Sequence, residues 1–476
     1  MSNSGVAQQY HWQNTSAHLL YACLAVLFLL LLTNFGYAQE EAKPNFIVIM
    51  ADDCTYHDLE VYGGQAKTPN LMSLAGEGMK FNRCFQATAM CAPTRQNLLT
   101  GLYPVKNGAY ANHSESYEHV KSIVHHLKPA GYQLALTGKR HIGPESVYPF
   151  VYSENTRDPD LDFIDKFIRE KKEKNQPFCL FAMCSSPHVP WTYGDTTQYP
   201  SEEILLPPYL IDTRDTREAY SQYLAEITYF DQQVGEILQL VDAHQLRSNT
   251  VVIVLSEQGS LFPFGKWTCY DAGLRSAMII RYPNVVKAAT VSNAMVEYVD
   301  IVPTILGLAN VNAVSDMDGS SFKQILLGET DQHKEYVFGI QTTRGINAAT
   351  QAYGIRSVRN DSLKYIVNLF PENRFENALL MNPEEWSATR VSYLWWMNSW
   401  RAAAAKQKRA NMMLERYQHR PAVELYNVRE DPYELVNLAL DPAYKDAMLK
   451  LDTKLTAWMQ SQGDEGRATE LKVLLR

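Results

Sequence analysis

The chain is poor in several features that mark specialised classes of protein. It has seven cysteines in 476 residues and no CxxC pair, so neither a disulfide scaffold nor a zinc–thiolate site is indicated. We expect buried thiols with at most one disulfide. Positive charge is not in excess: 44 lysines and arginines stand against 52 aspartates and glutamates, which argues against nonspecific nucleic-acid binding. The hydrophobic fraction of 46% and charged fraction of 20% exclude a disordered or collagen-like chain.

The N-terminal segment lacks charged side chains altogether, since residues 1–38 contain no Lys, Arg, Asp or Glu. Its apolar run, Leu19–Leu32, is 14 residues long. That is short for a membrane span, which needs about 20 residues, but typical of the core of a signal peptide. Gly36-Tyr37-Ala38 has the small-x-small pattern of a cleavage site. We therefore predict a signal peptide over residues 1–38, export to the periplasm or the medium, and no stable membrane span. The positive charge that usually precedes such a core is missing.

Short apolar runs alternate along the rest of the chain with helical patterns, which predicts an α/β fold with a mostly parallel sheet. Apolar residues recur every three or four positions from Tyr220 to Val241, as on one face of a helix. The clearest strand candidates are Phe46–Met50, Tyr132–Leu136, Phe178–Met183 and Val251–Leu255.

Polar side chains follow each of these four strand candidates. Because the carboxyl ends of parallel strands lie at one edge of a sheet, we expect these side chains to share one site. In strand order they are Asp52 and Asp53; Lys139 and His141; His188; and Glu257 and Gln258.

The residue types at this edge predict a metal site for charged substrates. Carboxylates and a carboxamide offer only oxygen ligands, which suit calcium or magnesium. Such a cation could hold one oxygen of a charged ester and polarise the centre under attack. Lys139, His141, His188 and Lys266 could then hold the other oxygens and serve the leaving group.

A candidate nucleophile lies at Cys91. Pro93 suits a first helical turn, so Cys91 is expected at a helix N-terminus, where negative charge is favoured. Arg95, about one turn further on, could reach back over it. Taken alone, the same pattern also fits an ordinary cysteine beside a helix cap with a solvated arginine.

Cys91-x-Pro93-x-Arg95, followed by Leu99-Thr100-Gly101, resembles the maturation motif of the formylglycine-dependent sulfatases. The resemblance implies an alkaline-phosphatase-like sandwich: a large, mostly parallel sheet flanked by helices, with a smaller C-terminal α+β subdomain carrying an antiparallel sheet. It also implies that a sulfatase-maturing enzyme oxidises Cys91 to formylglycine, whose hydrate is the nucleophile. The implied metal is calcium, with magnesium left open.

Matched residue by residue, the resemblance assigns a role to each member of the site. Arg95 would hold the hydrate, Lys139 and His141 would contact sulfate and nucleophile, His188 would lie near the leaving group, and Lys266 is the later basic residue. One departure is Glu257-Gln258, where Asp followed by Asn or His is usual. Each side chain is one methylene longer, so the backbone or the metal must shift by about 1 Å. The implied metal ligands are Asp52, Asp53, Cys91, Glu257 and Gln258.

A longer stretch of matching sequence indicates a narrower class of substrate. Residues 138–150, from Gly138 to Phe150, resemble the sulfamidases, which implies a sulfated glycan and the N-sulfate of glucosamine in heparan sulfate or heparin. Three alternatives stay open: an O-sulfatase on a glycosaminoglycan or other sulfated polysaccharide, a phosphodiesterase or phosphonate monoester hydrolase, and a non-catalytic glycan-binding relative.

We predict a catalytic domain over residues 39–344 and a subdomain over residues 345–476. The latter should end in a helix over Asp446–Gln460 with Leu449, Leu451, Leu455 and Trp458 as apolar positions. Six basic residues between Arg401 and Arg420 could line a cleft for an anionic sugar or form a solvated helix face.

Overall fold

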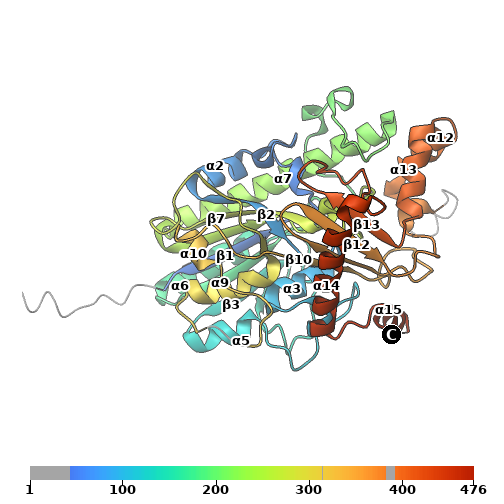
Figure 1. Cartoon of the computed structure of the whole chain (residues 1–476). Coiled ribbons are helices and arrows are strands. Elements are labelled where there is room, and N and C mark those ends of the chain that lie inside the picture. Colours follow the sequence, from blue (N-terminus) through green and yellow to red (C-terminus); the bar gives the residue numbers. More distant parts are fainter. Residues whose placement is uncertain (1–42, 313–314, 382–391, 476) are drawn as a thin grey trace, which may run out of the picture. The chain divides into compact units, whose positions relative to one another are not determined.

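The structure, a computed structural model, describes residues 43–312, 315–381 and 392–475 (Figure 1). The predicted signal peptide, with the Leu19–Leu32 run, lies outside these ranges and stays a prediction. Within the described ranges, no helix combines the length and the hydrophobicity needed to cross a bilayer. The cysteines in these ranges are all free and buried, as expected: Cys54, Cys84, Cys91, Cys179, Cys184 and Cys269.

A large sheet of nine strands carries the fold and is mostly parallel, as predicted. Its central strand β1 (Asn45–Met50) pairs in parallel with β5 (Phe178–Met183) and β6 (Thr250–Leu255). Only β7 (Arg275–Arg281) runs antiparallel to both of its neighbours, β6 and β2. The other strands are β2 (Met79–Phe85), β3 (Gln133–Gly138), β4 (Val151–Tyr152), β8 (Thr290–Ser292) and β9 (Val296–Glu297). All four strand candidates are confirmed, with β3 shifted by one or two residues.

Helices cover both faces of this sheet, which explains the unbroken apolar runs. Alternate residues of β1 pack into the two cores on opposite faces of the sheet. Phe46 and Val48 belong to one core, and Ile47 and Ile49 belong to the other. Figure 1 shows α2 and α7 on one side of the sheet and α5 and α9 on the other. Ile47 shares its core with α2 (Pro69–Glu77), α6 (Leu161–Glu173) and α7 (Arg214–Ala243), and Val48 with α3 (Cys91–Thr100), α5 (Ile123–Leu127) and α9 (Ile301–Leu308). The predicted helix at 220–241 is confirmed as α7.

The C-terminal part forms a four-stranded antiparallel sheet, as the resemblance implied. The predicted helix over 446–460 is α14 (Lys445–Gln462), but it is not the last helix, because a further helix follows at residues 467–474. Helix α14 packs Leu451, Leu455 and Trp458 against the small sheet, whereas Leu449 is 67% exposed, so its assignment to the apolar face was wrong. The strands are β10 (Val337–Gln341), β11 (Ile355–Arg359), β12 (Leu363–Asn368) and β13 (Val423–Asn427), and the remaining helices are α4 (Pro104–Asn107), α8 (Asp271–Leu274), α10 (Lys323–Leu326), α12 (Met397–Ala404), α13 (Lys408–Gln418) and α15 (Arg467–Leu474). β10 precedes residue 345, and the domain boundary there stays a prediction.

The small sheet is tied to the segment of chain that carries Cys91. The Ile340 N–H donates to the Ala87 carbonyl oxygen at 2.7 Å, and the Asn112 N–H donates to the Arg344 carbonyl oxygen at 3.2 Å. The residues that follow β10 are therefore held against the large sheet, where they can contribute to the same site.

The basic segment 401–420 matches neither interpretation fully. It forms the two helices α12 and α13 rather than one. Arg420 is buried with its guanidinium 4.2 Å from the centre of the Phe375 ring, and Arg416 lies 4.9 Å from the centre of the Phe264 ring. These two arginines contribute cation–π packing to the core instead of lining a cleft or facing solvent.

Candidate active site

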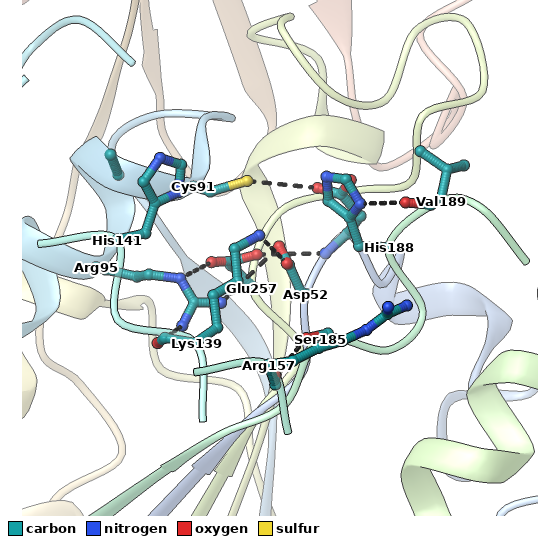
Figure 2. Close-up of polar contacts among 12 residues, drawn as sticks. Asp52, Cys91, Arg95, Lys139, His141, Arg157, Ser185, His188, Val189 and Glu257 are labelled. Atoms are coloured by element: carbon teal, nitrogen blue, oxygen red, sulfur yellow. Dashed lines mark hydrogen bonds and ion pairs between the residues drawn. The ribbon is translucent and has the colours of Figure 1, made fainter. Parts of the chain in front are cut away.

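The polar residues predicted to meet at the sheet edge do so in the structure. The parallel strands β1, β3, β5 and β6 end side by side, and the residues that follow them bring Asp52, Lys139, His188 and Glu257 together (Figure 2). Two of these turns are strained: Asp53 and Glu257 both have φ of 61°, a left-handed conformation that non-glycine residues rarely adopt. Such strain is typical of functional sites, where the surrounding fold maintains it.

Strand β2 delivers Cys91 to the same edge, and the sequence analysis missed this strand. β2 ends at Phe85, and α3 begins at Cys91, so the predicted position of Cys91 at a helix N-terminus is confirmed. The signal that could have found β2 is the alternation of Met79 and Phe81 with polar Lys80.

Arg95 lies beneath the acidic residues and is fully buried. Its Nε lies 3.0 Å from Glu257 Oε1, and its terminal nitrogen lies 3.8 Å from Asp52 Oδ1. Breaking one partner of such a buried pair leaves an uncompensated charge. The Arg95 side chain therefore fixes both carboxylates in place, a role beyond the one that the resemblance implied.

Two lysines form ion pairs with the two aspartates of the cluster. Lys139 forms an ion pair with Asp52, and the Lys266 Nζ lies 2.6 Å from Asp53 Oδ2. Burial alone would raise the pKa of Asp52, but the Lys139 charge beside it lowers that pKa well below its ordinary value. Arg95, Lys139 and Lys266 thus lie against the three acidic side chains Asp52, Asp53 and Glu257.

Cys91 faces this cluster and is 2% exposed. Its Sγ lies 3.9 Å from Asp53 Oδ1 and 2.9 Å from Gln258 Nε2. Burial, together with the Asp52 carboxylate, raises the pKa of the Cys91 thiol to about 12. The unmodified side chain is thus a protonated thiol at neutral pH and a poor nucleophile.

The acidic cluster fits a hard divalent cation. Asp52, Asp53, Cys91 and Glu257 each offer a ligand atom, all within 4.8 Å of one another. Asp52 Oδ1 and Gln258 Oε1 are buried and have no hydrogen-bond partner in the described part of the chain, and Glu257 Oε1 is buried with Arg95 Nε 3.0 Å away. Burial and the adjacent Asp52 raise the pKa of Glu257 well above its ordinary value. A cation would relieve this crowding of carboxylates. The Gln258 amide nitrogen Nε2 donates a hydrogen bond to Asp53 Oδ1 at 2.8 Å, so the amide oxygen Oε1 of Gln258 faces away from that carboxylate.

The cluster opens into a cavity of about 490 Å³ lined by Cys91, Lys139, His141, His188 and Lys266. His188 Nδ1 donates to the Val189 carbonyl oxygen at 2.6 Å, so that Nε2, 3.5 Å from Asp53 Oδ2, is the nitrogen turned to the site. All ten predicted residues therefore belong to one contiguous site, formed by this cluster and the cavity.

The sequence analysis missed the remaining wall of the cavity. It is formed by Asn112, His113, Val189, Leu261, Trp267, Gly345, Ile346, Asn347, Ala348, Ala378 and Tyr393. Val189, Leu261 and Trp267 lie in the segments that follow predicted strands, whereas most of the other residues come from the C-terminal part of the chain. The hydrogen bonds that dock β10 onto the large sheet bring them to the cavity, which strand patterns do not indicate.

Comparisons with known proteins agree with this geometry. The sequence profile of the sulfatase family matches residues 44–311, and the profile described as N-sulphoglucosamine sulphohydrolase, C-terminal, matches residues 259–376. An ulvan-active sulfatase of Formosa agariphila is 32% identical over 89% of this chain and 81% of its own length. The human N-sulphoglucosamine sulphohydrolase is 26% identical over 93% of this chain and 94% of its own length. A solved structure of a protein in complex with its substrate, D-glucosamine-2-N,6-O-disulfate, has a similar fold, with a TM-score of 0.66, 21% identity and coverage of 89% of this chain and 99% of that one.

Proposed function

Since the chain belongs to the sulfatase family, we propose that it hydrolyses the sulfate groups of a sulfated glycan, with the N-sulfate of glucosamine in heparan sulfate or heparin as the preferred substrate. The observation that carries the proposal is the position of Cys91 between the buried carboxylates and the lysine- and histidine-lined cavity. A divalent cation bound in this cluster would add positive charge beside Lys139 and Lys266, which suits an anionic substrate.

The proposed metal is Ca²⁺, with Mg²⁺ as the alternative. Asp52, Asp53, Glu257 and residue 91 would hold it, and Gln258 could join them through its carboxamide oxygen. When bound, the cation would polarise the sulfate group under attack. Lys139 and Lys266 reach the same carboxylates from the cavity side, so their ammonium groups can hold the outer oxygens of a bound sulfate.

We further propose that a sulfatase-maturing enzyme converts Cys91 to formylglycine. The raised pKa of the Cys91 thiol supports this conversion, because the buried thiol by itself is a poor nucleophile. The aldehyde hydrate would supply one hydroxyl to attack sulfur and a second whose deprotonation releases sulfate. Because Cys91 is 2% exposed, the maturing enzyme must reach it before the chain has folded, which is consistent with the proposed export to the periplasm or the medium.

His188 is the proposed proton donor to the leaving group. Its Nδ1–H is donated to the Val189 carbonyl oxygen, so Nε2 is the atom that would take up a proton in the cavity and pass it to the leaving group. Cleavage of an N–S bond requires protonation of the departing nitrogen. Trp267 and Tyr393 give the cavity aromatic faces suited to packing against a sugar ring.

The choice of an N-sulfate is supported by the match to the N-sulphoglucosamine sulphohydrolase C-terminal profile and by the human relative, which aligns over most of both chains. A second candidate is an O-sulfate of a sulfated polysaccharide. It is favoured by the 32% identity to an ulvan-active sulfatase over 89% of the chain.

A panel of defined substrates tests the function. The matured protein is assayed for sulfate release from glucosamine N-sulfate, from 6-O-sulfated N-acetylglucosamine and from ulvan oligosaccharides, and for turnover of a phosphodiester analogue. We expect the N-sulfate to have the highest kcat/KM. Preference for an O-sulfate would favour the second candidate, preference for the phosphodiester would favour a phosphodiesterase, and binding without turnover would favour a glycan-binding relative.

Glu257→Asp tests the departure from the usual ligand pair. We expect sulfatase activity within about tenfold of the unchanged protein, since the carboxylate charge is kept and the shorter side chain is the usual ligand of the family. Glu257→Gln, which removes the charge at nearly constant volume, is the matched variant and should lose far more. Complete loss in Glu257→Asp with normal folding would mean that its surroundings require the longer side chain.

A further inference from the structure

Two residues outside the predicted site, Asn112 and His113, are connected to His141. His113 Nδ1 lies 2.7 Å from His141 Nε2, with the ring centres 4.6 Å apart, and both histidines line the cavity that contains Cys91. Both also have positive φ, 62° for His113 and 48° for His141. Two strained turns therefore converge on one hydrogen bond between imidazoles, which requires that one ring donates and the other accepts.

The direction of that hydrogen bond follows from Asn112. Its Oδ1 accepts from the Ala92 N–H at 3.4 Å, and its Nδ2 donates to the Gly345 carbonyl oxygen at 3.3 Å. These two backbone partners fix which way the amide points, and its amino group faces His113 Nε2 at 3.4 Å. Gly345 must lack a side chain for this approach, because it has φ of 85° and a Cβ there would lie 2.4 Å from Asn112 Cβ.

These contacts determine which ring nitrogens of His113 and His141 carry a proton. Since the Asn112 amino group is a donor, His113 Nε2 must accept, and the proton of neutral His113 is on Nδ1. His113 Nδ1 then donates to His141 Nε2, which leaves the His141 proton on Nδ1. His141 Nδ1 is buried and has no hydrogen-bond partner among the described residues.

We propose that Asn112 and His113 are positioning residues that fix His141 as the neutral Nδ1–H tautomer, so that His141 presents a hydrogen-bond donor rather than a base to the oxygen atoms of the reacting group. The identity of that group as a sulfate rests on the proposed function. The charged groups around the two rings are Lys139 and Lys266 near His113, and Lys139, Arg95 and Asp52 near His141. Burial and the Lys139 charge lower the pKa of His141 to about 3, which is consistent with a neutral ring.

The tautomer of His141 can be measured directly by nitrogen NMR of protein labelled with ¹⁵N-histidine, with the His141 signals identified from their loss in His141→Gln. We expect the Nδ1–H pattern in the unchanged protein. Asn112→Asp, which keeps the acceptor for Ala92 but turns an oxygen toward His113, should reverse both tautomers and give His141 Nε2–H. His113→Asp should do the same. An Nε2–H pattern in the unchanged protein, or an unchanged tautomer in Asn112→Asp, overturns the proposal.

Kinetics of the matured enzyme provide the second readout. His113→Ala should lower kcat about 10–100-fold with little change in KM, as expected for loss of an orienting partner. His113→Asn keeps a donor near the Nδ1 position and should retain more activity than His113→Ala. His119→Ala, in the same segment but away from the cavity, is the matched control and should not change kcat. Equal losses in His113→Asn and His113→Ala would contradict a positioning role. The spectra need no substrate, so absence of sulfate release by the unchanged protein would count against the proposed function alone.

Discussion

Replacing Cys91 with alanine is expected to abolish sulfate release, with a loss of at least about 10⁴-fold in kcat/KM. In the proposed mechanism every other group in the site holds, orients or protonates the substrate, whereas residue 91 alone supplies the atom that attacks sulfur. Cys91→Ser should be nearly as inactive, because a serine lacks the second hydroxyl that releases sulfate and regenerates the nucleophile. The measurement is release of inorganic sulfate from the best substrate of the panel.

Cys179→Ala is the matched control for this prediction. Cys179 is also a buried free thiol, but it lies within β5 and points into the core rather than the cavity. We expect this variant to keep its activity at temperatures where it remains folded. Activity in Cys91→Ala comparable to that of Cys179→Ala would show that residue 91 is not the nucleophile.

Removal of the divalent cation should have the second largest effect. A chelator is expected to lower sulfate release by about 10²-fold or more, since metal polarisation of the sulfate is worth several kcal/mol, and added Ca²⁺ should restore it. The comparison of Ca²⁺ with Mg²⁺ in the restoration step identifies the preferred cation.

Metal binding can also be followed without activity. In Cys91→Ala, which keeps Asp52, Asp53 and Glu257, Ca²⁺ at 100 times its dissociation constant should stabilise the fold by about 2.7 kcal/mol. Asp53→Asn, which is isosteric but uncharged, should reduce this shift in the unfolding temperature. Full activity after exhaustive chelation, with no shift on adding Ca²⁺, would contradict a metal site in this cluster.

The charged residues of the site could be predicted from the sequence because the carboxyl ends of parallel strands lie at one edge of the sheet. Asp52, Lys139, His188 and Glu257 each follow a strand whose apolar run is easily recognised, so topology alone brings them together. Cys91 was found through its motif, although the strand that delivers it was missed. The alternation of Met79 and Phe81 with Lys80 is short and is interrupted by the polar pair Asn82-Arg83.

The remaining wall of the cavity, which includes Asn112, His113 and Gly345, could not be predicted from the ends of strands. Gly345 and Asn112 meet only because the small sheet docks on the large one through hydrogen bonds between distant backbone groups. The pairing of His113 with His141 depends on two turns of positive φ, a property that sequence patterns for histidine do not indicate. Arg416 and Arg420 were misjudged for a related reason: their aromatic partners come from other parts of the chain.

The mass of the peptide that contains residue 91, from a preparation that releases sulfate, tests the account most directly. We predict that the thiol is replaced by the aldehyde of formylglycine, and that the converted fraction rises and falls with specific activity across preparations. A fully active preparation in which residue 91 remains an unmodified cysteine would contradict the account.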